Sequence, residues 1–187
     1  QILTFLYFCH MLPFFKPKPI LKDIIPDNFI DIHSHLLPGI DDGAQNIDDT
    51  VFLISEIEKM GFKQCITTPH VMENVWRNSR KKIELNLNTT QTELKSKNIS
   101  FPIKAAAEYM MDANFVTLFQ NEGLLTLKKN YVLVEISYIN PPIQLYDIIF
   151  DLQVAGYKPI LAHPERYSFF HHNFNDYQNF KYFVCLF

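Results

Sequence analysis

The stretch FIDIHSHLLPGIDDGA, residues 29–44, passes from an apolar run into a loop that carries two histidines and two aspartates. His33 and His35 lie one residue apart where the apolar run ends, and Asp41 and Asp42 follow in the loop. Alone, the histidines could be an ordinary core or surface pair, and Asp-Asp-Gly could be only a turn. They become candidates for metal ligands if similar residues recur where later apolar runs end.

The rest of the chain alternates short apolar runs with longer amphipathic segments, which is the pattern of an α/β protein. Besides a first strand over 28–36, the sequence predicts strands over 62–68, 102–109, 131–137 and 158–163. Helices are predicted between them, over about 46–60, 79–97, 112–120 and 143–156. The run YVLVEIS is apolar on both faces, as a buried parallel strand is. We therefore expect a parallel α/β fold.

Each later predicted strand also ends in a residue type that binds metal ions. In chain order these residues are His70, Glu108, Glu135 and His163. Because the carboxyl ends of parallel strands converge on one face, we expect seven side chains at one mouth: His33, His35, Asp42, His70, Glu108, Glu135 and His163.

Such a group of carboxylates and imidazoles needs cations, because buried charges are costly unless they are neutralised. Imidazole and carboxylate without thiolate suit Mn, Fe or Zn. Seven ligands exceed what one ion requires, so we expect two or three ions. His171 and His172 lie in an aromatic loop beyond the last predicted strand, where a structural role is favoured.

Size and composition indicate one globular domain, since the chain has 187 residues, 48% of them hydrophobic and 20% charged. The net charge of -3 and the scattered lysines argue against nucleic acid as a partner. Cys9, Cys65 and Cys185 are odd in number and far apart, which predicts neither a disulfide framework nor a cysteine zinc site. A cytoplasmic setting fits this cysteine usage.

The sequence supports a separate prediction for each end of the chain. Residues 1–27 are expected to be an N-terminal extension whose natural start is Met11, and residues 28–187 the domain itself. The apolar opening QILTFLYFCHMLPFF ends short of the ~20 residues that a membrane span needs and lacks the features of a signal peptide. The chain closes on the apolar NFKYFVCLF, which we interpret as a fold that is incomplete at its C-terminus.

The motifs DIHSHLLPGIDDGA, TTPH, AAEYM, VLVEIS and LAHPERY together resemble the PHP (polymerase and histidinol phosphatase) superfamily. The resemblance covers residues 29–183 and is closest to the branch of capsular polysaccharide-type bacterial protein-tyrosine-phosphatases. It implies a distorted, TIM-like (β/α)₇ barrel with a manganese-preferring site of three ions, held by the seven residues above. The family also carries a late Asp-x-His pair, which does not occur after His163 here.

The resemblance further implies metal-dependent hydrolysis of protein phosphotyrosine in capsule or exopolysaccharide biosynthesis. Arg166 matches the arginine that contacts the phosphate, and His33 and His70 are expected to act beside it in catalysis. The implied partner is the phosphorylated, tyrosine-rich tail of a membrane-bound bacterial tyrosine kinase, with no insertion of this chain into the membrane. The resemblance also implies that the protein acts in the cytoplasm.

The loop VMENVWRNSR, residues 71–80, carries Trp76, Arg77 and Arg80. An aromatic ring beside two cations could receive a phosphotyrosine ring and the acidic groups around it. Equally, Trp76 could simply hold the loop against the barrel.

Other functions compete with this interpretation. A cysteine-dependent phosphatase needs Arg six residues after its Cys, but Val71 follows Cys65 and Phe15 follows Cys9 at that spacing. A small-molecule phosphatase of the histidinol-phosphatase type remains open because it uses a similar metal site. An amidohydrolase also begins with His-x-His, although Glu on successive strands argues against its ligand set. The non-enzymatic alternative is an inactive, truncated metal-binding fragment.

Overall fold

The structure, a computed structural model, describes residues 18–26, 28–171, 175, 178 and 180. The proposed start at Met11 lies outside them, as do Cys9, His172 and Cys185.

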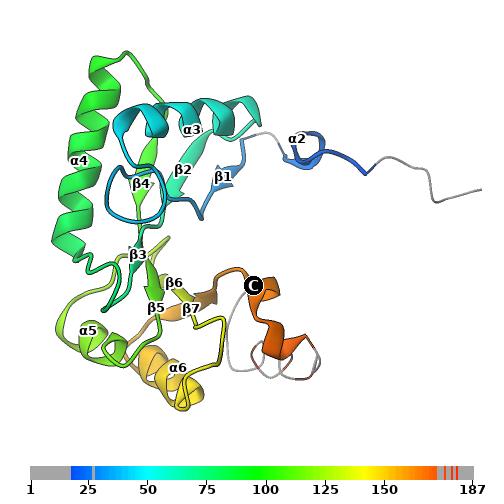
Figure 1. Cartoon of the computed structure of the whole chain (residues 1–187), viewed down its shortest axis with the longest axis vertical. Coiled ribbons are helices and arrows are strands. Elements are labelled where there is room, and N and C mark those ends of the chain that lie inside the picture. Colours follow the sequence, from blue (N-terminus) through cyan, green and yellow to red (C-terminus); the bar gives the residue numbers. More distant parts are fainter. Residues whose placement is uncertain (1–17, 27, 172–174, 176–177, 179, 181–187) are drawn as a thin grey trace, which may run out of the picture.

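The described chain alternates helices and strands in the predicted order (Figure 1). The helices are α2 (Leu21–Ile24), α3 (Ile47–Lys59), α4 (Arg80–Ser96), α5 (Phe115–Asn121) and α6 (Leu145–Val154). The strands are β1 (Ile30–Asp31), β2 (Gln64–Thr67), β3 (His70–Val71), β4 (Ile103–Ala105), β5 (Glu108–Met110), β6 (Tyr131–Glu135) and β7 (Lys158–Leu161). Two 3-10 helices follow, η2 (Pro164–Arg166) and η3 (Ser168–Phe170). Among the described α-helices, only α2 was not predicted.

The strands form two parallel sheets, in the orders β1-β2-β4 and β3-β5-β6-β7. In Figure 1, α3 and α4 lie beside the first sheet, and α5 and α6 lie beside the second. This arrangement confirms the predicted parallel α/β class. The hydrogen bonds between the described strands do not close a ring, so the barrel itself stays an expectation.

The predicted third strand, 102–109, divides into β4 and β5, which corrects its expected boundaries. The predicted second strand, 62–68, is β2 alone, and a separate strand, β3, follows the break at Pro69. Pro69 has no N–H to donate, but its carbonyl accepts from the Glu108 N–H at 3.1 Å, which continues the pairing across the break. His70 and Glu108 consequently begin strands instead of ending them. The predicted first strand is also shorter, and leaves His33 and His35 in the loop that follows it.

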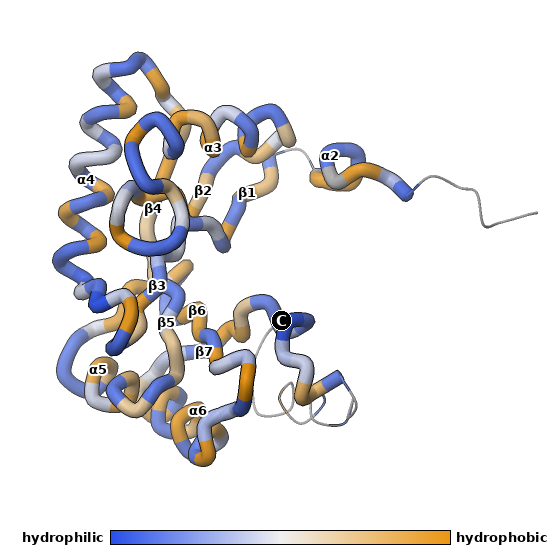
Figure 2. Tube along the Cα trace, viewed as in Figure 1, coloured by the Kyte–Doolittle hydropathy of each residue, from blue (hydrophilic) through white to orange (hydrophobic). Residues whose placement is uncertain are grey.

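The two long helices begin at the residues the sequence predicts. The Asn46 side chain caps α3 by accepting from the N–H groups of Asp48 and Asp49, and Ser79 caps α4 by accepting from the Lys82 N–H. Hydrophobic residues recur between hydrophilic ones along α4 (Figure 2), and Ile83 and Leu94 are among those that it buries.

Two hydrophobic clusters hold the sheets to their helices. One includes residues of α3 and α4 and contains Leu36, Ile54, Cys65, Leu94 and Ile103. The larger one surrounds β5, β6 and β7 and includes residues of α5, α6 and η3. None of the described helices is long and apolar enough to cross a bilayer.

Candidate metal centre

All seven predicted ligands line one cavity of about 1140 Å³. His33, His35 and Asp42 come from the loop after β1. The other four come from the second sheet or its end: His70 opens β3, Glu108 opens β5, Glu135 ends β6 and His163 follows β7. The structure therefore brings together residues separated by up to 130 positions in the sequence, and their role as ligands remains our proposal.

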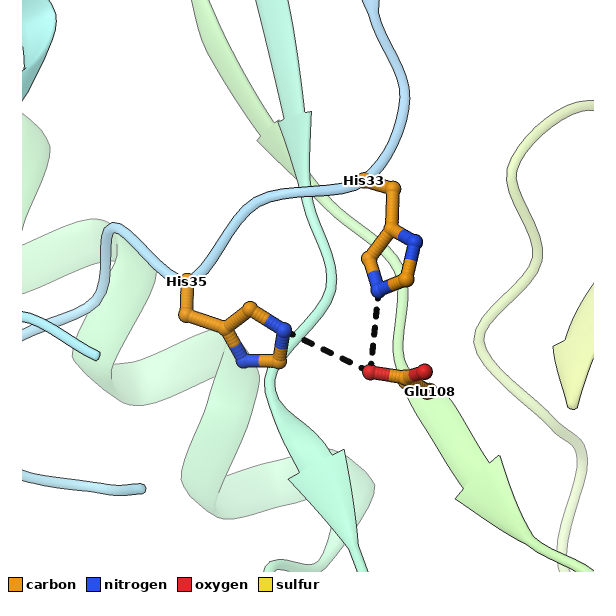
Figure 3. Close-up of side chains that lie close together, drawn as sticks. All are labelled: His33, His35 and Glu108. Carbon is orange, nitrogen blue, oxygen red and sulfur yellow. Dashed lines mark hydrogen bonds and ion pairs between the residues drawn. The ribbon is translucent and has the colours of Figure 1, made fainter. Parts of the chain in front are cut away.

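Glu108 lies at the centre of this group, with its side chain wholly buried. Its Oε2 is 3.0 Å from Nε2 of His33 and 3.4 Å from Nε2 of His35, and the three side chains point toward one another (Figure 3). Oε2 is also 3.4 Å from Nδ1 of His70, while Oε1 is 2.9 Å from Nε2 of His163. Burial raises the pKa of Glu108, but hydrogen bonds with the histidines outweigh burial and hold the pKa well below its usual range. The carboxylate is thus ionised and placed to bridge several ligand positions.

Glu135 and His70 give the clearest test of whether cations fit here. The Oε1 of Glu135 and the Nδ1 of His70 are buried and form an ion pair at 2.8 Å, but neither makes a well-aligned hydrogen bond. Nδ1 of His163 is also buried and has no hydrogen-bond partner among the described residues. Buried polar atoms are normally satisfied, so incompletely satisfied atoms of ligand type at this cavity fit a bound cation. The residues present are therefore suited to metal ions.

The potential ligand atoms fall into three overlapping groups. These are His33, His35 and Glu108; His35, Asp42 and His70; and His70, Glu108 and Glu135. Within each group the atoms lie within 4.8 Å of one another. Because the groups share members, the geometry suits neighbouring ions more than one isolated ion.

Asp41 was not among the seven predicted ligands, since its Asp-Asp-Gly context was equally typical of a turn, yet it contacts two of them. Its side chain is buried, and its Oδ2 is 2.8 Å from Nδ1 of His35. It also accepts from the N–H groups of Gly43 at 3.0 Å and of His70 at 3.1 Å. A carboxylate on one ring nitrogen orients the other nitrogen toward a metal. Asp41 thereby ties the loop ligand His35 to the first residue of β3.

The same contacts shift the pKa values of both partners. Burial lowers the pKa of His35, but its bonds with Asp41 and Glu108 outweigh burial and raise the pKa to about 10. Burial raises the pKa of Asp41, but the His35 contact and the backbone donors outweigh it and lower the pKa below the usual value. The pair is thus charged when no ion is bound.

The loop that carries the first ligands is held by side-chain hydrogen bonds. Thr67 Oγ1 donates to the Ser34 carbonyl at 2.8 Å and accepts from the Leu36 N–H at 2.9 Å. Gly43 packs so closely that an added Cβ would lie 2.2 Å from the carbonyl oxygen of His35. Only glycine fits this approach.

Arg166 lies in η2 and lines the same cavity. Its Nη1 donates to the Tyr138 hydroxyl at 3.4 Å, and this contact raises the already high pKa of Arg166. The guanidinium is therefore a permanent cation at the cavity wall. His163 turns the chain into η2 with a φ of 33°, in the left-handed region that non-glycine residues rarely adopt.

The loop after β3 matches its prediction only in part. Trp76 lines the cavity and stacks on the His70 ring, with centroids 4.7 Å apart and planes at 12°. Arg77 instead donates to the Glu73 carbonyl, Arg80 pairs with Glu84, and neither is among the residues around the cavity. The aromatic residue reaches the site and the two cations do not.

The sequence of this chain is similar to those of several known proteins. Residues 29–186 match the family described as "Capsular polysaccharide synthesis, CpsB/CapC". Tyrosine-protein phosphatase YwqE of Bacillus subtilis is 29% identical over 138 residues, which are 73% of this chain and 54% of YwqE. Tyrosine-protein phosphatase CpsB of Streptococcus pneumoniae is 25% identical over 145 residues, 77% of this chain and 60% of CpsB. The chain thus spans roughly half to three fifths of these relatives.

The backbone of this chain is similar to that of a solved structure. That structure is one of those of YwqE from Bacillus subtilis and CpsB from Streptococcus pneumoniae, which are described as unique metal-dependent tyrosine phosphatases. The TM-score is 0.77 at 25% identity, over 84% of this chain and 64% of the other.

Proposed function

This chain belongs to the CpsB/CapC family of capsular polysaccharide synthesis, and from that premise we propose that it hydrolyses phosphate monoesters with bound metal ions. The observation that carries the proposal is Glu108, a wholly buried carboxylate whose oxygens face four histidine rings. The similar proteins YwqE and CpsB are named tyrosine-protein phosphatases, which favours protein phosphotyrosine as the substrate.

The proposed ligands are the seven residues around the cavity, holding two or three Mn²⁺ ions, with Fe or Zn as alternatives: His33, His35, Asp42, His70, Glu108, Glu135 and His163. Such ions, when bound, supply an activated water and neutralise the oxygens of the phosphoryl group. In this proposal His33 and His70 act beside Arg166 in catalysis, as the family resemblance implies, and both contact Glu108 and line the cavity.

The chain's own side chains have further roles. Arg166 is proposed to bind phosphoryl oxygens, because a guanidinium pairs well with phosphate. Trp76 and Ile139 give the cavity apolar surface on which a phenyl ring can pack. A phenolate leaving group has a conjugate-acid pKa of about 10, so it departs without an obligatory acid from the protein.

The proposed biological setting follows the family resemblance. The substrate would be the phosphorylated tail of a bacterial tyrosine kinase that acts in capsule or exopolysaccharide biosynthesis, and the reaction would take place in the cytoplasm. Cys65 is unpaired and buried, which is compatible with that reducing compartment.

Chelation and alkylation test the reaction class. Hydrolysis of a phosphotyrosine peptide by the Mn²⁺-loaded chain should be abolished by a chelator and restored by added Mn²⁺. Alkylation should leave it unchanged, since Cys65 is 0% exposed and burial raises the pKa of its thiol to about 12. Activity that survives chelation but not alkylation would exclude the proposed mechanism.

The role of Arg166 can be separated from metal binding. Arg166→Ala should lower turnover by about 100-fold or more, the cost of losing a donor to developing charge, while metal content stays constant. Elemental analysis and turnover on the same preparation measure both. Parallel loss of metal would assign Arg166 a structural role.

A further inference from the structure

Tyr138 lies between the proposed metal ligands and the proposed phosphate-binding arginine. It follows β6, three residues after Glu135, and lines the cavity. Its hydroxyl is 3.3 Å from Nε2 of His163 and accepts from Nη1 of Arg166 at 3.4 Å. No role for this residue follows from the sequence motifs, so its placement needs its own explanation.

The Tyr138 ring is held in place from one side and open on the other. It stacks on Tyr167, with centroids 5.8 Å apart and planes at 26°. Tyr167 is wholly buried, and its hydroxyl accepts from the Ile136 N–H at 3.2 Å. Tyr138 itself is 44% exposed. The hydroxyl is therefore positioned by packing and can still reach a ligand in the cavity.

The hydrogen-bonding capacity of the hydroxyl limits what it can do. A phenol has one proton and two lone pairs. Arg166 has no acceptor and donates to the oxygen, so the hydroxyl proton is left for an acceptor elsewhere. The Nε2 of His163 does not take this proton, because it faces the ionised Glu108 carboxylate at 2.9 Å, and a carboxylate can only accept the proton that Nε2 carries.

The hydroxyl proton thus has no acceptor among the described contacts of Tyr138, and it can be donated to a ligand in the cavity. An anionic oxygen beside Arg166 is well placed to accept it.

We propose that the Tyr138 hydroxyl is a phosphoryl-binding donor that acts with Arg166 on the same anion. This inference rests on the phosphate-ester hydrolysis proposed above. It makes Tyr138 a substrate-binding residue and not a metal ligand.

Tyr138→Phe tests the proposal, because the variant keeps the stacked ring and removes only the hydroxyl. The Kd of inorganic phosphate is measured by calorimetry on the Mn²⁺-loaded protein, with metal content and Tm measured in parallel. We expect phosphate affinity to fall about 3- to 10-fold, as for loss of one hydrogen bond, with metal content and Tm unchanged. The KM for a phosphotyrosine peptide should rise by a similar factor, with little change in kcat.

Two controls locate the effect. Tyr131→Phe removes a hydroxyl from a tyrosine that does not line the cavity, and should leave phosphate affinity unchanged. In an Arg166→Gln background, Tyr138→Phe should cost less than in the wild type, because the two groups act on one anion. Additive losses would contradict that shared action.

The outcomes separate this inference from the function beneath it. If the Mn²⁺-loaded wild type binds phosphate and Tyr138→Phe binds it equally well, the inference is wrong and the proposed function stands. Loss of metal in Tyr138→Phe would also overturn it, by assigning the hydroxyl to support of the metal site. If the loaded wild type binds no phosphate, the proposed function fails together with the inference.

Discussion

The two sheets contribute to the cavity in different ways. Beside the first sheet, His33, His35 and Asp42 sit in a loop, whereas His70, Glu108 and Glu135 of the second sheet lie on the strands themselves. The proposed ligands on the strands are positioned by the backbone hydrogen bonds of a parallel ladder. The proposed ligands in the loop depend on individual side chains, chiefly Asp41 and Thr67. Metal binding by the loop residues should therefore weaken when residues that touch no metal are substituted. Metal binding by the strand residues should not.

Glu108→Gln should produce the largest loss of metal binding. The amide keeps the shape of the side chain but removes the charge that faces four histidine rings, and its NH₂ cannot act as an oxygen ligand. We expect Mn²⁺ affinity to fall by more than about 100-fold, since loss of an outer-shell partner alone costs about 10- to 100-fold. Calorimetric Mn²⁺ titration measures this, and hydrolysis should be lost with it.

Glu93→Gln is the matched control, because Glu93 lies on the exposed side of α4. Circular dichroism of both metal-free variants should match the wild type, because the strand ladder holds the backbone at β5. An unfolded Glu108→Gln variant would show that the carboxylate also supports the fold, which would weaken the contrast between the two sheets.

The sequence was sufficient to predict the seven residues around the cavity because each follows or interrupts a recognisable apolar run. The starts of α3 and α4 were predictable for a local reason, since Asn46 and Ser79 are N-cap residues. That Asp41 also turns inward could not be predicted, because it depends on the path of the loop against His35 and β3.

Other features depend on contacts that the sequence pattern does not contain. The separate strands β3 and β5 reflect pairing between distant segments. The position of Tyr138 depends on packing against Tyr167, 29 residues later. Arg77 and Arg80 were candidates for the cavity, but each pairs with an acid four residues away, Glu73 and Glu84.

Asp41→Asn should have the next largest effect and would show that the loop depends on a residue that is not proposed as a ligand. Asn has only one acceptor oxygen, so it cannot serve both the His35 ring and the two backbone N–H groups. We expect Mn²⁺ affinity to fall about 10- to 100-fold. The same titration measures it.

Asp48→Asn, in the exposed first turn of α3, is the control and should leave Mn²⁺ affinity unchanged. A loss from Asp41→Asn as large as that from Glu108→Gln would indicate that Asp41 itself contacts metal. Unchanged affinity would show that the loop ligands are positioned without it.

Thr67→Val should have the smallest effect on metal and should instead reduce the stability of the fold. Valine has nearly the shape of threonine. The Ser34 carbonyl still accepts from the N–H of Thr68 at 2.7 Å. The Leu36 N–H loses its acceptor, which is expected to cost about 1–3 kcal/mol for a buried donor. Thermal unfolding of the metal-free chain should therefore begin several degrees lower. Mn²⁺ affinity should change only a few-fold, because Asp41 and Glu108 still contact His35.

Thr89→Val supplies the comparison for that measurement, since Thr89 is exposed on α4 and its hydroxyl donates only to the Leu85 carbonyl within the helix. It should change the free energy of unfolding by less than about 0.5 kcal/mol. Glu108→Gln would then remove metal without unfolding the chain, and Thr67→Val would weaken the fold with little loss of metal. If Thr67→Val lowers Mn²⁺ affinity as far as Asp41→Asn does, the position of the loop backbone, and not the orientation of the His35 ring, controls the ligands of the first sheet.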